Sequence, residues 1–259
     1  MDARHAEGYL ARIGYTGGRA PTVDTLRALH RAHLHAVPFE NLDVHLGRPI
    51  VLDLRALFRK VVDERRGGFC YELNGLFGEL LAFLGFEVSL LSARVAHQGG
   101  GFGPEFDHLV LLVTGATAGG RWLADVGFGR SFHEPLSLDA GLEEEAEGRV
   151  YRVEHGSDAW RVESRQPGGE SQAEYAFTLT PHPFDAFAGM CEYHQTSPAS
   201  HFTQKVVCSL PGAGGRRTLS GHTLIEVAGE VRRETPLDDD ARAQALQSHF
   251  GIHVTTTLG

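Results

Sequence analysis

The chain has few cysteines, no long apolar run and no excess of positive charge. Its 259 residues include three cysteines, Cys70, Cys191 and Cys208. These are too few and too unevenly spaced for a disulfide framework, which fits a reducing compartment. No stretch approaches the roughly 18 apolar residues of a membrane span, and no apolar signal segment follows Asp2 and Arg4. We therefore expect a cytoplasmic protein with no membrane partner.

Positive charge is scarce because 24 basic residues stand against 33 acidic ones, for a formal net charge of −9. Such a balance argues against nucleic acid or an anionic membrane as a partner. At this length the chain can bury a large core and divide into two or three subdomains. The sequence contains no internal repeat and no low-complexity segment.

Metal and phosphate-binding patterns are also missing. His30 and His33 can share one helix face, but no cysteine or carboxylate lies at ligand spacing beside them. The glycine-rich stretch 99–103 is followed by neither Lys-Ser/Thr nor a helix, so it does not match a phosphate-binding loop. We therefore expect no bound metal.

The most informative segment surrounds Cys70. Between Leu73 and Leu84, apolar residues recur at three- and four-residue spacing, which predicts a buried helix that ends at Gly85. The glycine pair 67–68 permits a tight turn before the helix, so the sulfur would lie near unpaired N–H groups and the positive end of the helix dipole. A thiol there ionises more easily, and Cys70 is a candidate nucleophile. The alternative is an ordinary buried cysteine.

Two predicted strands carry its candidate partners. Short apolar runs at 106–113 and 122–127 have strand length and are separated by turn residues, so we expect an antiparallel pair. His108 and Asp125 would face the same side of this pair, where the carboxylate would fix the imidazole tautomer. Asp107 precedes His108 in its strand, so its side chain should point to the opposite face. For each partner taken alone, a purely structural role is the alternative.

Several short segments follow one another in the order of a known family. They are VPFENL at 37–42, RGGFCYELN at 66–74, FDHL at 106–109, DVGFG at 125–129 and SPASHF at 197–202. Together they resemble the arylamine N-acetyltransferases, and the resemblance extends over nearly the whole chain. Each segment alone is a weak signal, but the ordered set is highly specific.

The resemblance implies acetyl transfer from acetyl-CoA by a ping-pong mechanism without a metal. Acetyl-CoA would acylate Cys70, and an arylamine, arylhydrazine or arylhydroxylamine would then take the acetyl group. His108 would act as the base and Asp125 would hold it in place. The chemistry fits the residues independently, since a thiolate attacks a thioester readily and the acyl-enzyme stays reactive towards an amine. The implied partners are these small molecules, and a homo-oligomer is left open.

The resemblance also implies binding residues. Phe39, Phe69, Phe128 and Phe202 fall where relatives place the aromatic walls of the acceptor site, and aromatic rings suit a flat aromatic amine. Ordinary core packing is the alternative for each of them. Gly127 and Gly129 would let the donor, acetyl-CoA, approach the backbone closely.

The pattern of elements predicts an α+β fold. Residues 1–85 favour helices, with Thr22 and Asp53 as helix caps, and strands and turns follow to about residue 180. The acidic run 142–148 is expected to be a solvated loop or a short exposed helix. The resemblance implies a helical bundle at 1–85 with the nucleophile, a β-barrel at 86–185 with His and Asp, and an α/β lid at 186–259, around a cysteine-protease-like Cys-His-Asp site.

Other functions stay open at this point. A cysteine hydrolase or a transglutaminase-like enzyme would use the same Cys, His and Asp order, and some members of the family are amide synthases that act on a carrier-bound acyl chain. A binding protein that keeps the fold without turnover is a further alternative. The 37–42 segment and the aromatic positions favour N-acetyl transfer.

Overall fold

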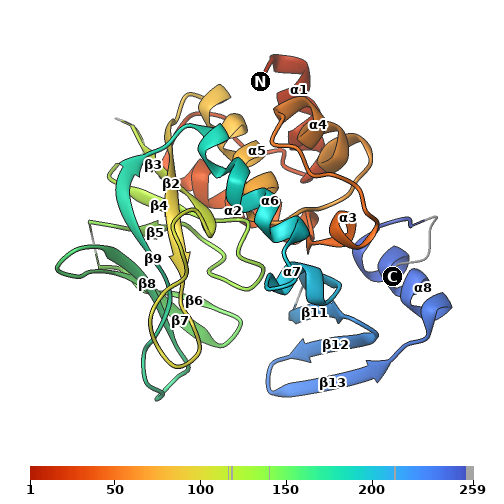
Figure 1. Ribbon diagram of the computed structural model, residues 1–259. Helices are drawn as coiled ribbons and strands as arrows, with labels where there is room; N and C mark the ends of the chain where they lie inside the picture. The colour runs from red at the N-terminus through yellow and green to blue at the C-terminus, as the bar shows by residue number, and fades with distance from the viewer. Residues whose placement is uncertain (116, 118, 140, 213, 255–259) are drawn as a thin grey trace.

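Helices dominate the first third of the chain and strands the remainder (Figure 1). The computed structural model describes residues 1–115, 117, 119–139, 141–212 and 214–254. The N-terminal helices are α1 (Ala3–Arg12), α2 (Val23–Ala36), α3 (Leu42–His45), α4 (Leu54–Phe58), the π-helical turn Arg59–Asp63 and α5 (Cys70–Phe83). Among the described residues, every helix is too short or too polar to cross a bilayer.

The predicted helix caps are present. The backbone N–H of Thr25 donates to the Thr22 hydroxyl at the start of α2, and that of Ala56 donates to the Asp53 carboxylate at the start of α4. These bonds satisfy N–H groups that lack a partner within the helix.

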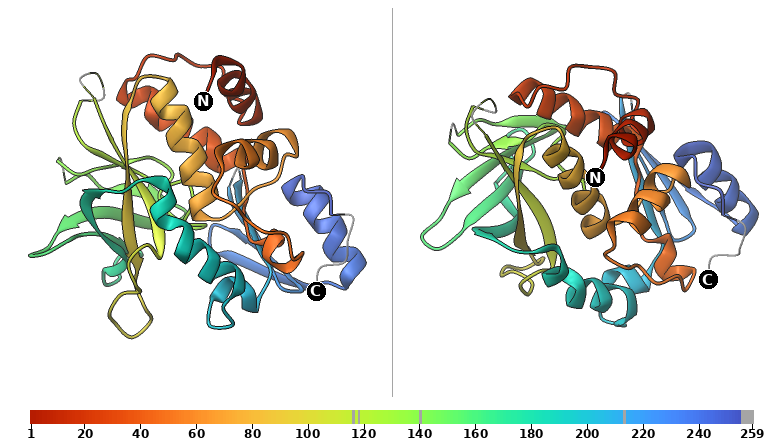
Figure 2. Two further views of the ribbon diagram at one scale, coloured as in Figure 1. Left: turned by 45° about the horizontal axis from the view of Figure 1, so that its top comes forward. Right: turned by 90° about the horizontal axis from the view of Figure 1, so that it is seen from above.

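Helix α5 lies at the centre of the molecule, between the other N-terminal helices and the strands (Figure 2). Its apolar residues are completely buried at Leu73, Phe77 and Leu80, as the periodicity predicts. The helix stops before Gly85, whose φ of 95° lies in the region that favours glycine. The element that begins with Cys70 is therefore held on all sides.

Eight antiparallel strands form a nearly closed barrel in the order β5-β4-β3-β2-β9-β8-β7-β6. They are β2 (Glu87–Val95), β3 (His108–Thr114), β4 (Trp122–Ala124), β5 (Leu136–Ser137), β6 (Glu144–Ala146), β7 (Arg149–His155), β8 (Trp160–Arg165) and β9 (Gln172–Pro181). A separate core inside the barrel includes Leu91, Val110 and Tyr151.

The predicted antiparallel pairing of the strands near His108 and Asp125 is confirmed. Strand β3 pairs with β4, with Leu111 opposite Ala124. Of the turn predicted between them, Ala116 and Ala118 lie outside the described residues.

The prediction for the acidic run at 142–148 is correct for residues 142 and 143, which are exposed and lie in a loop, and wrong for the residues that follow. Residues 144–146 form β6, which pairs with β7 through a turn at Glu147 and Gly148. The Glu144 carboxylate faces inward and accepts the backbone N–H groups of His133 and Glu134. Charge density indicated solvent exposure, but these backbone donors give the carboxylate a partly buried place.

The C-terminal part contains a five-stranded sheet in the order β1-β10-β11-β12-β13. Its strands are β1 (Phe39–Glu40), β10 (Val207–Gly212), β11 (Gly215–Ser220), β12 (Thr223–Ala228) and β13 (Val231–Pro236). The accompanying helices are the 3-10 turn Phe184–Phe187, α6 (Ala188–Thr196), α7 (His201–Gln204) and α8 (Asp239–Phe250). The α+β class and the three-part plan are confirmed, and the residue boundaries between the parts stay a prediction.

Substitution of Gly67 tests how tightly the turn before α5 is packed. A Cβ at this position would lie 1.8 Å from the carbonyl oxygen of Pro38. We expect Gly67→Ala to lower the free energy of unfolding by about 3 kcal/mol or more, because the backbone must move apart. Urea denaturation checks this. The control is Gly18→Ala, where a Cβ meets no atom within 4 Å. Equal stability of the two variants would contradict the expectation.

Buried histidines of α2 predict a loss of stability in mild acid. Burial lowers the pKa of His30 to about 4, and it also lowers that of His33. The folded state therefore binds fewer protons than the unfolded chain, whose histidines titrate near 6.5. The resulting stability is complete above about pH 6.5 and declines as the pH falls towards 4. Denaturation across this range should show a shallower decline for His33→Asn than for the wild type.

Candidate active site

Cys70 is the first residue of α5 and is almost completely buried. The backbone N–H of the preceding Phe69 donates to the Glu72 carboxylate over 3.1 Å, which is the reciprocal contact of a capping box. A Cβ at Gly68 would lie 2.6 Å from the same carboxylate. Glycine is therefore required where the chain turns into the helix.

A buried ion network holds this turn. Lys60 Nζ lies 2.7 Å from the Glu72 carboxylate and 2.8 Å from that of Asp43. Arg66 lies 3.0 Å from Asp43 and 2.8 Å from Glu40. Burial raises the pKa of Glu72 to about 7. Burial opposes the charge on Lys60, but the surrounding carboxylates raise its pKa. The network joins the 37–42 and 66–74 segments that the family resemblance rests on.

His108 and Asp125 form a buried hydrogen bond. His108 Nε2 donates to one Asp125 oxygen over 2.8 Å. The other oxygen accepts the Asn74 amide over 2.8 Å and the Gly127 N–H over 2.9 Å. Burial disfavours the charged carboxylate, but His108 and these donors hold the pKa of Asp125 below its usual value. Asp125 is therefore ionised and fixed in orientation.

Asn74 connects the cysteine helix to both strands. It lies one turn after Cys70, and its amide also donates to the Leu109 carbonyl over 2.7 Å. Its oxygen accepts the Val126 N–H over 2.9 Å. Sequence reasoning included Asn74 in the motif but assigned it no role, because these bonds depend on how the helix meets the barrel.

The sulfur of Cys70 lies beside the start of β3. The backbone of Leu109, next to His108, partly offsets the rise in the pKa of the Cys70 thiol. A Cβ at Gly127 would lie 2.7 Å from the Cys70 Cα, so the loop after Asp125 packs directly on the backbone at Cys70. Close packing against Cys70 therefore explains why residue 127 is a glycine.

The expectation of a more acidic thiol is not met in this structure. Burial raises the pKa of Cys70, and the Asp125 charge adds to the effect. Desolvation outweighs the helix dipole, which acts within one turn and is worth less than full burial. Burial therefore favours the neutral form of the thiol, and its ionisation needs a nearby proton acceptor.

Tyr175 is a site residue that sequence reasoning missed. Its ring centre lies 5.3 Å from that of His108 and 5.1 Å from that of Phe128. Burial, and then the proximity of Asp125, raises the pKa of its phenol. The sequence places Tyr175 only in a strand, and no local signal shows that its ring lies beside those of His108 and Phe128.

Three of the four predicted aromatic residues come together. The Phe202 ring lies 5.4 Å from Phe69 and 6.1 Å from Phe39. Phe128 is separate and packs edge-on against His108 at 5.1 Å. Phe69 is completely buried, whereas Phe39, Phe128 and Phe202 are partly exposed.

Asp107 has other partners than His108. It lies 3.2 Å from His194 Nε2 and accepts the Val95 N–H over 3.3 Å. This pair joins α6 to the start of β3. Asp107 is thus directed away from the imidazole, as its position in the strand indicates.

A cavity of about 330 Å³ lies between the barrel and the C-terminal sheet. Phe39, Phe128 and Gly129 line it, together with Arg130 and Arg232. Gly129 has a φ of 84° and lies against the Phe39 ring. This cavity is therefore bordered by residues predicted to bind the acceptor, Phe39 and Phe128, and by Gly129, predicted to bind the donor. Arginine side chains also line it.

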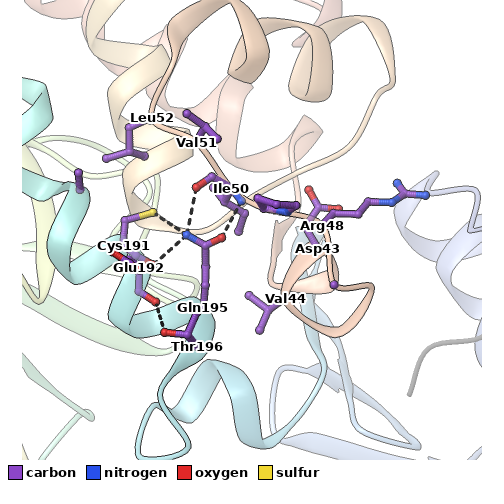
Figure 3. Close-up of a pocket in the computed structure, with 13 residues that line it drawn as sticks. Asp43, Val44, Arg48, Ile50, Val51, Leu52, Cys191, Glu192, Gln195 and Thr196 are labelled. Atoms are coloured by element: carbon purple, nitrogen blue, oxygen red, sulfur yellow. Dashed lines mark hydrogen bonds between the residues drawn. The ribbon is translucent and has the colours of Figure 1, made fainter.

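A second cavity, of about 490 Å³, lies between the loop that follows α3 and helix α6 (Figure 3). Its walls include Ile50, Val51, Cys191 and Gln195. The Gln195 side chain bridges the two walls by accepting the Ile50 N–H over 2.6 Å. This cavity has the larger volume, but none of Cys70, His108 and Asp125 lines it. We therefore do not take it as the active site.

Among the described residues, no three histidine, cysteine or acidic side chains are grouped closely enough to hold a metal. His30 and His33 lie on α2, as expected, but each contacts other groups. Cys70, Cys191 and Cys208 are all free.

The chain matches a family model over most of its length. Residues 22–258 correspond to the family described as N-acetyltransferase. With a buried cysteine at a helix start beside a His-Asp pair, the match defines an enzyme that transfers acyl groups.

Comparison with individual relatives shows which kind of N-acetyltransferase the chain is similar to. The chain is 39% identical to an arylamine N-acetyltransferase of Mycolicibacterium smegmatis, over 97% of this chain and 93% of the relative. The solved enzyme of Salmonella typhimurium is 33% identical with a TM-score of 0.89, covering 99% and 93% of the two chains. That of Mycobacterium marinum, solved in complex with CoA, is 36% identical with a TM-score of 0.87, covering 95% and 92%. The chain belongs to the arylamine N-acetyltransferase family.

Substitution of Lys60 tests how much the buried ion network contributes to stability. Lys60→Met would leave the Glu72 and Asp43 carboxylates buried without their shared cation, and we expect a loss of about 3–5 kcal/mol in the free energy of unfolding. Lys205→Met is the matched control, because Lys205 is exposed. Thermal and urea denaturation of both variants measure the difference. Two variants of wild-type stability would show that the network contributes nothing.

Proposed function

We propose that the chain transfers the acetyl group of acetyl-CoA to the nitrogen of an arylamine, arylhydrazine or arylhydroxylamine. The reaction proceeds by a ping-pong mechanism through an acetyl-Cys70 intermediate. The observation that carries the proposal is the buried His108–Asp125 hydrogen bond, which Asn74 ties to the helix that begins with Cys70.

In the first half-reaction, His108 takes the thiol proton of Cys70 as the sulfur attacks the thioester carbonyl. This coupling suits a thiol whose pKa is raised by burial, because the base then takes the proton as the sulfur attacks. The developing oxyanion requires donors, for which the backbone N–H of Cys70 and a neighbour are suited. The tetrahedral intermediate collapses, and CoA leaves as a thiol with the proton from His108.

In the second half-reaction, the nitrogen of the acceptor attacks acetyl-Cys70. His108 removes the proton of that nitrogen and returns it to the Cys70 sulfur as the sulfur leaves, which restores the thiol and the neutral imidazole. Asp125 keeps the ring in one tautomer and stabilises the imidazolium in both halves. The fixed carboxylate, held by Asn74 and Gly127, supports this role.

The cavity between the barrel and the C-terminal sheet suits the donor. Arg130 and Arg232 line it and can face the phosphates of acetyl-CoA. Gly129 permits close approach to the backbone near the triad, and we place Gly127 beside it on the cysteine side. The Mycobacterium marinum relative in complex with CoA supports acetyl-CoA as the co-substrate.

Aromatic side chains suit the acceptor. We assign Phe39, Phe128 and Phe202 as walls, because their rings are partly exposed near the nucleophile. Phe69 is completely buried and supports the other rings from behind. Since a catalytic thiol must stay reduced, we place the enzyme in the cytoplasm.

The mass of the intact protein after brief mixing with acetyl-CoA tests the proposal. We expect the wild type to gain one acetyl group and to lose it when a simple arylamine is added, with formation of the N-acetyl product. Cys70→Ala should gain none. Cys191→Ala is the matched control, because Cys191 is also buried and free, and it should be acetylated like the wild type.

Two outcomes would contradict the proposal. Acetylation of Cys70→Ala would place the acetyl group elsewhere. An unmodified wild type whose Cys70 is still rapidly alkylated would leave a reactive cysteine with another donor, which favours an amide synthase or a hydrolase.

A further inference from the structure

The imidazole of His30 contacts the backbone of the candidate catalytic aspartate. His30 lies on α2 and is completely buried. The Asp125 N–H donates to His30 Nε2 over 3.1 Å. On the other side of the ring, His30 Nδ1 donates to the His133 carbonyl over 2.8 Å. A single side chain therefore bridges the two ends of the 125–133 loop.

These contacts require one protonation state. Nε2 must carry a lone pair to accept an N–H, and Nδ1 must carry a proton to donate to a carbonyl. Burial, which lowers the pKa of His30 to about 4, keeps this neutral form at physiological pH. The ring also stacks on Phe132, with centres 5.7 Å apart and planes 11° apart. His30 is thus rigid in position and in tautomer.

The position of Asp125 explains why a side chain is needed there. Strand β4 ends at Ala124, so Asp125 is the first residue beyond the ladder. Its N–H is buried and would have no partner there without His30. A buried unpaired N–H costs about 1–3 kcal/mol, which favours rotation of the peptide towards another acceptor. Such a rotation would also turn the carboxylate away from His108.

We infer that His30 is a positioning residue, which fixes the Asp125 peptide so that its carboxylate meets His108 in line for proton transfer. The inference rests on the proposed acetyl transfer through Cys70. His30 does not touch the reacting atoms. Its contact with His133 continues to Glu147, 3.0 Å from His133 Nε2, and Glu147 lines the donor cavity. The His133 side chain carries this second contact, whereas His30 bonds only to the His133 backbone, so His30 acts on the position of Asp125 and not on the cavity.

The test compares variants of two buried histidines on one helix. His30→Leu removes both hydrogen bonds, and His30→Gln restores an acceptor at the place of Nε2. His33→Leu is the matched control, because His33 is equally buried but bonds to Tyr9 and not to the barrel. For each protein we would measure the thermal midpoint, the rate of Cys70 acetylation in single turnover, and the KM for acetyl-CoA.

We expect His30→Leu to slow acetylation about tenfold or more with little change in KM, since small misplacements of catalytic groups cost this much. His30→Gln should recover most of the rate. His33→Leu should lose a similar amount of stability while keeping the rate within about twofold, because the hydrogen bond of His33 goes to Tyr9 on α1 and not to the Asp125 loop. Equal rates for His30→Leu and His33→Leu would overturn the inference.

Alkylation of Cys70 by iodoacetamide, measured against pH, is a second readout that needs no acetyl-CoA. Its pH profile should shift in His30→Leu and not in His33→Leu. If the wild type is never acetylated, the proposed function fails, and this profile still decides the role of His30. An unshifted profile in His30→Leu would overturn the inference.

Nitrogen-15 NMR of the wild type decides the case if the leucine variant does not fold. The His30 ring should show a protonated Nδ1, an unprotonated Nε2 and a coupling from Nε2 to the Asp125 amide. A protonated Nε2 would refute the contact on which the inference depends.

Discussion

The buried ion network around Lys60 is the constraint on which the rest of the site depends. Charged groups in an interior are costly unless each is paired, and here Lys60 and Arg66 share the carboxylates of Glu40, Asp43 and Glu72. Glu72 also caps the helix that begins with Cys70. Because Glu72 must pair with Lys60 and also caps α5, the ion pairs fix where that helix begins. The hydrogen bonds of Asn74 then join the fixed helix to the barrel.

Three separate stretches of chain meet at the site, and each is held by backbone contacts as well as by side chains. The cysteine helix reaches both strands through Asn74, and the loop after Asp125 packs on the Cys70 backbone through Gly127. Burial then makes the thiol less acidic and the aspartate more dependent on its donors. In the mechanism that we propose, the proton of Cys70 therefore passes to His108 within a buried interior, where water does not supply the acceptor.

Much of this could be predicted from the sequence, because the relevant signals are local. Apolar periodicity predicts the helix at Cys70, and strand length with an intervening turn predicts the pairing that brings His108 to Asp125. The contacts of Lys60, Tyr175 and His30 could not be predicted, since each depends on which elements pack together. The acidic run was misinterpreted for the same reason: its charge suggested solvent, but partners distant in the chain gave it a place in the barrel.

The two-residue strand β1 links the beginning and the end of the chain. Phe39 and Glu40 pair with Ser209 and Cys208, and the neighbouring Asn41 accepts the Val207 N–H. During synthesis, residues 39–41 leave the ribosome long before their partners exist. A chain that stops short of residue 207 lacks strand β10, with which Glu40 pairs. Glu40 in turn holds Arg66, which lies just before the turn into the helix of Cys70. Truncated chains would therefore carry Cys70 without these contacts, so the order of translation itself delays assembly of the site until residues 207–209 have been made.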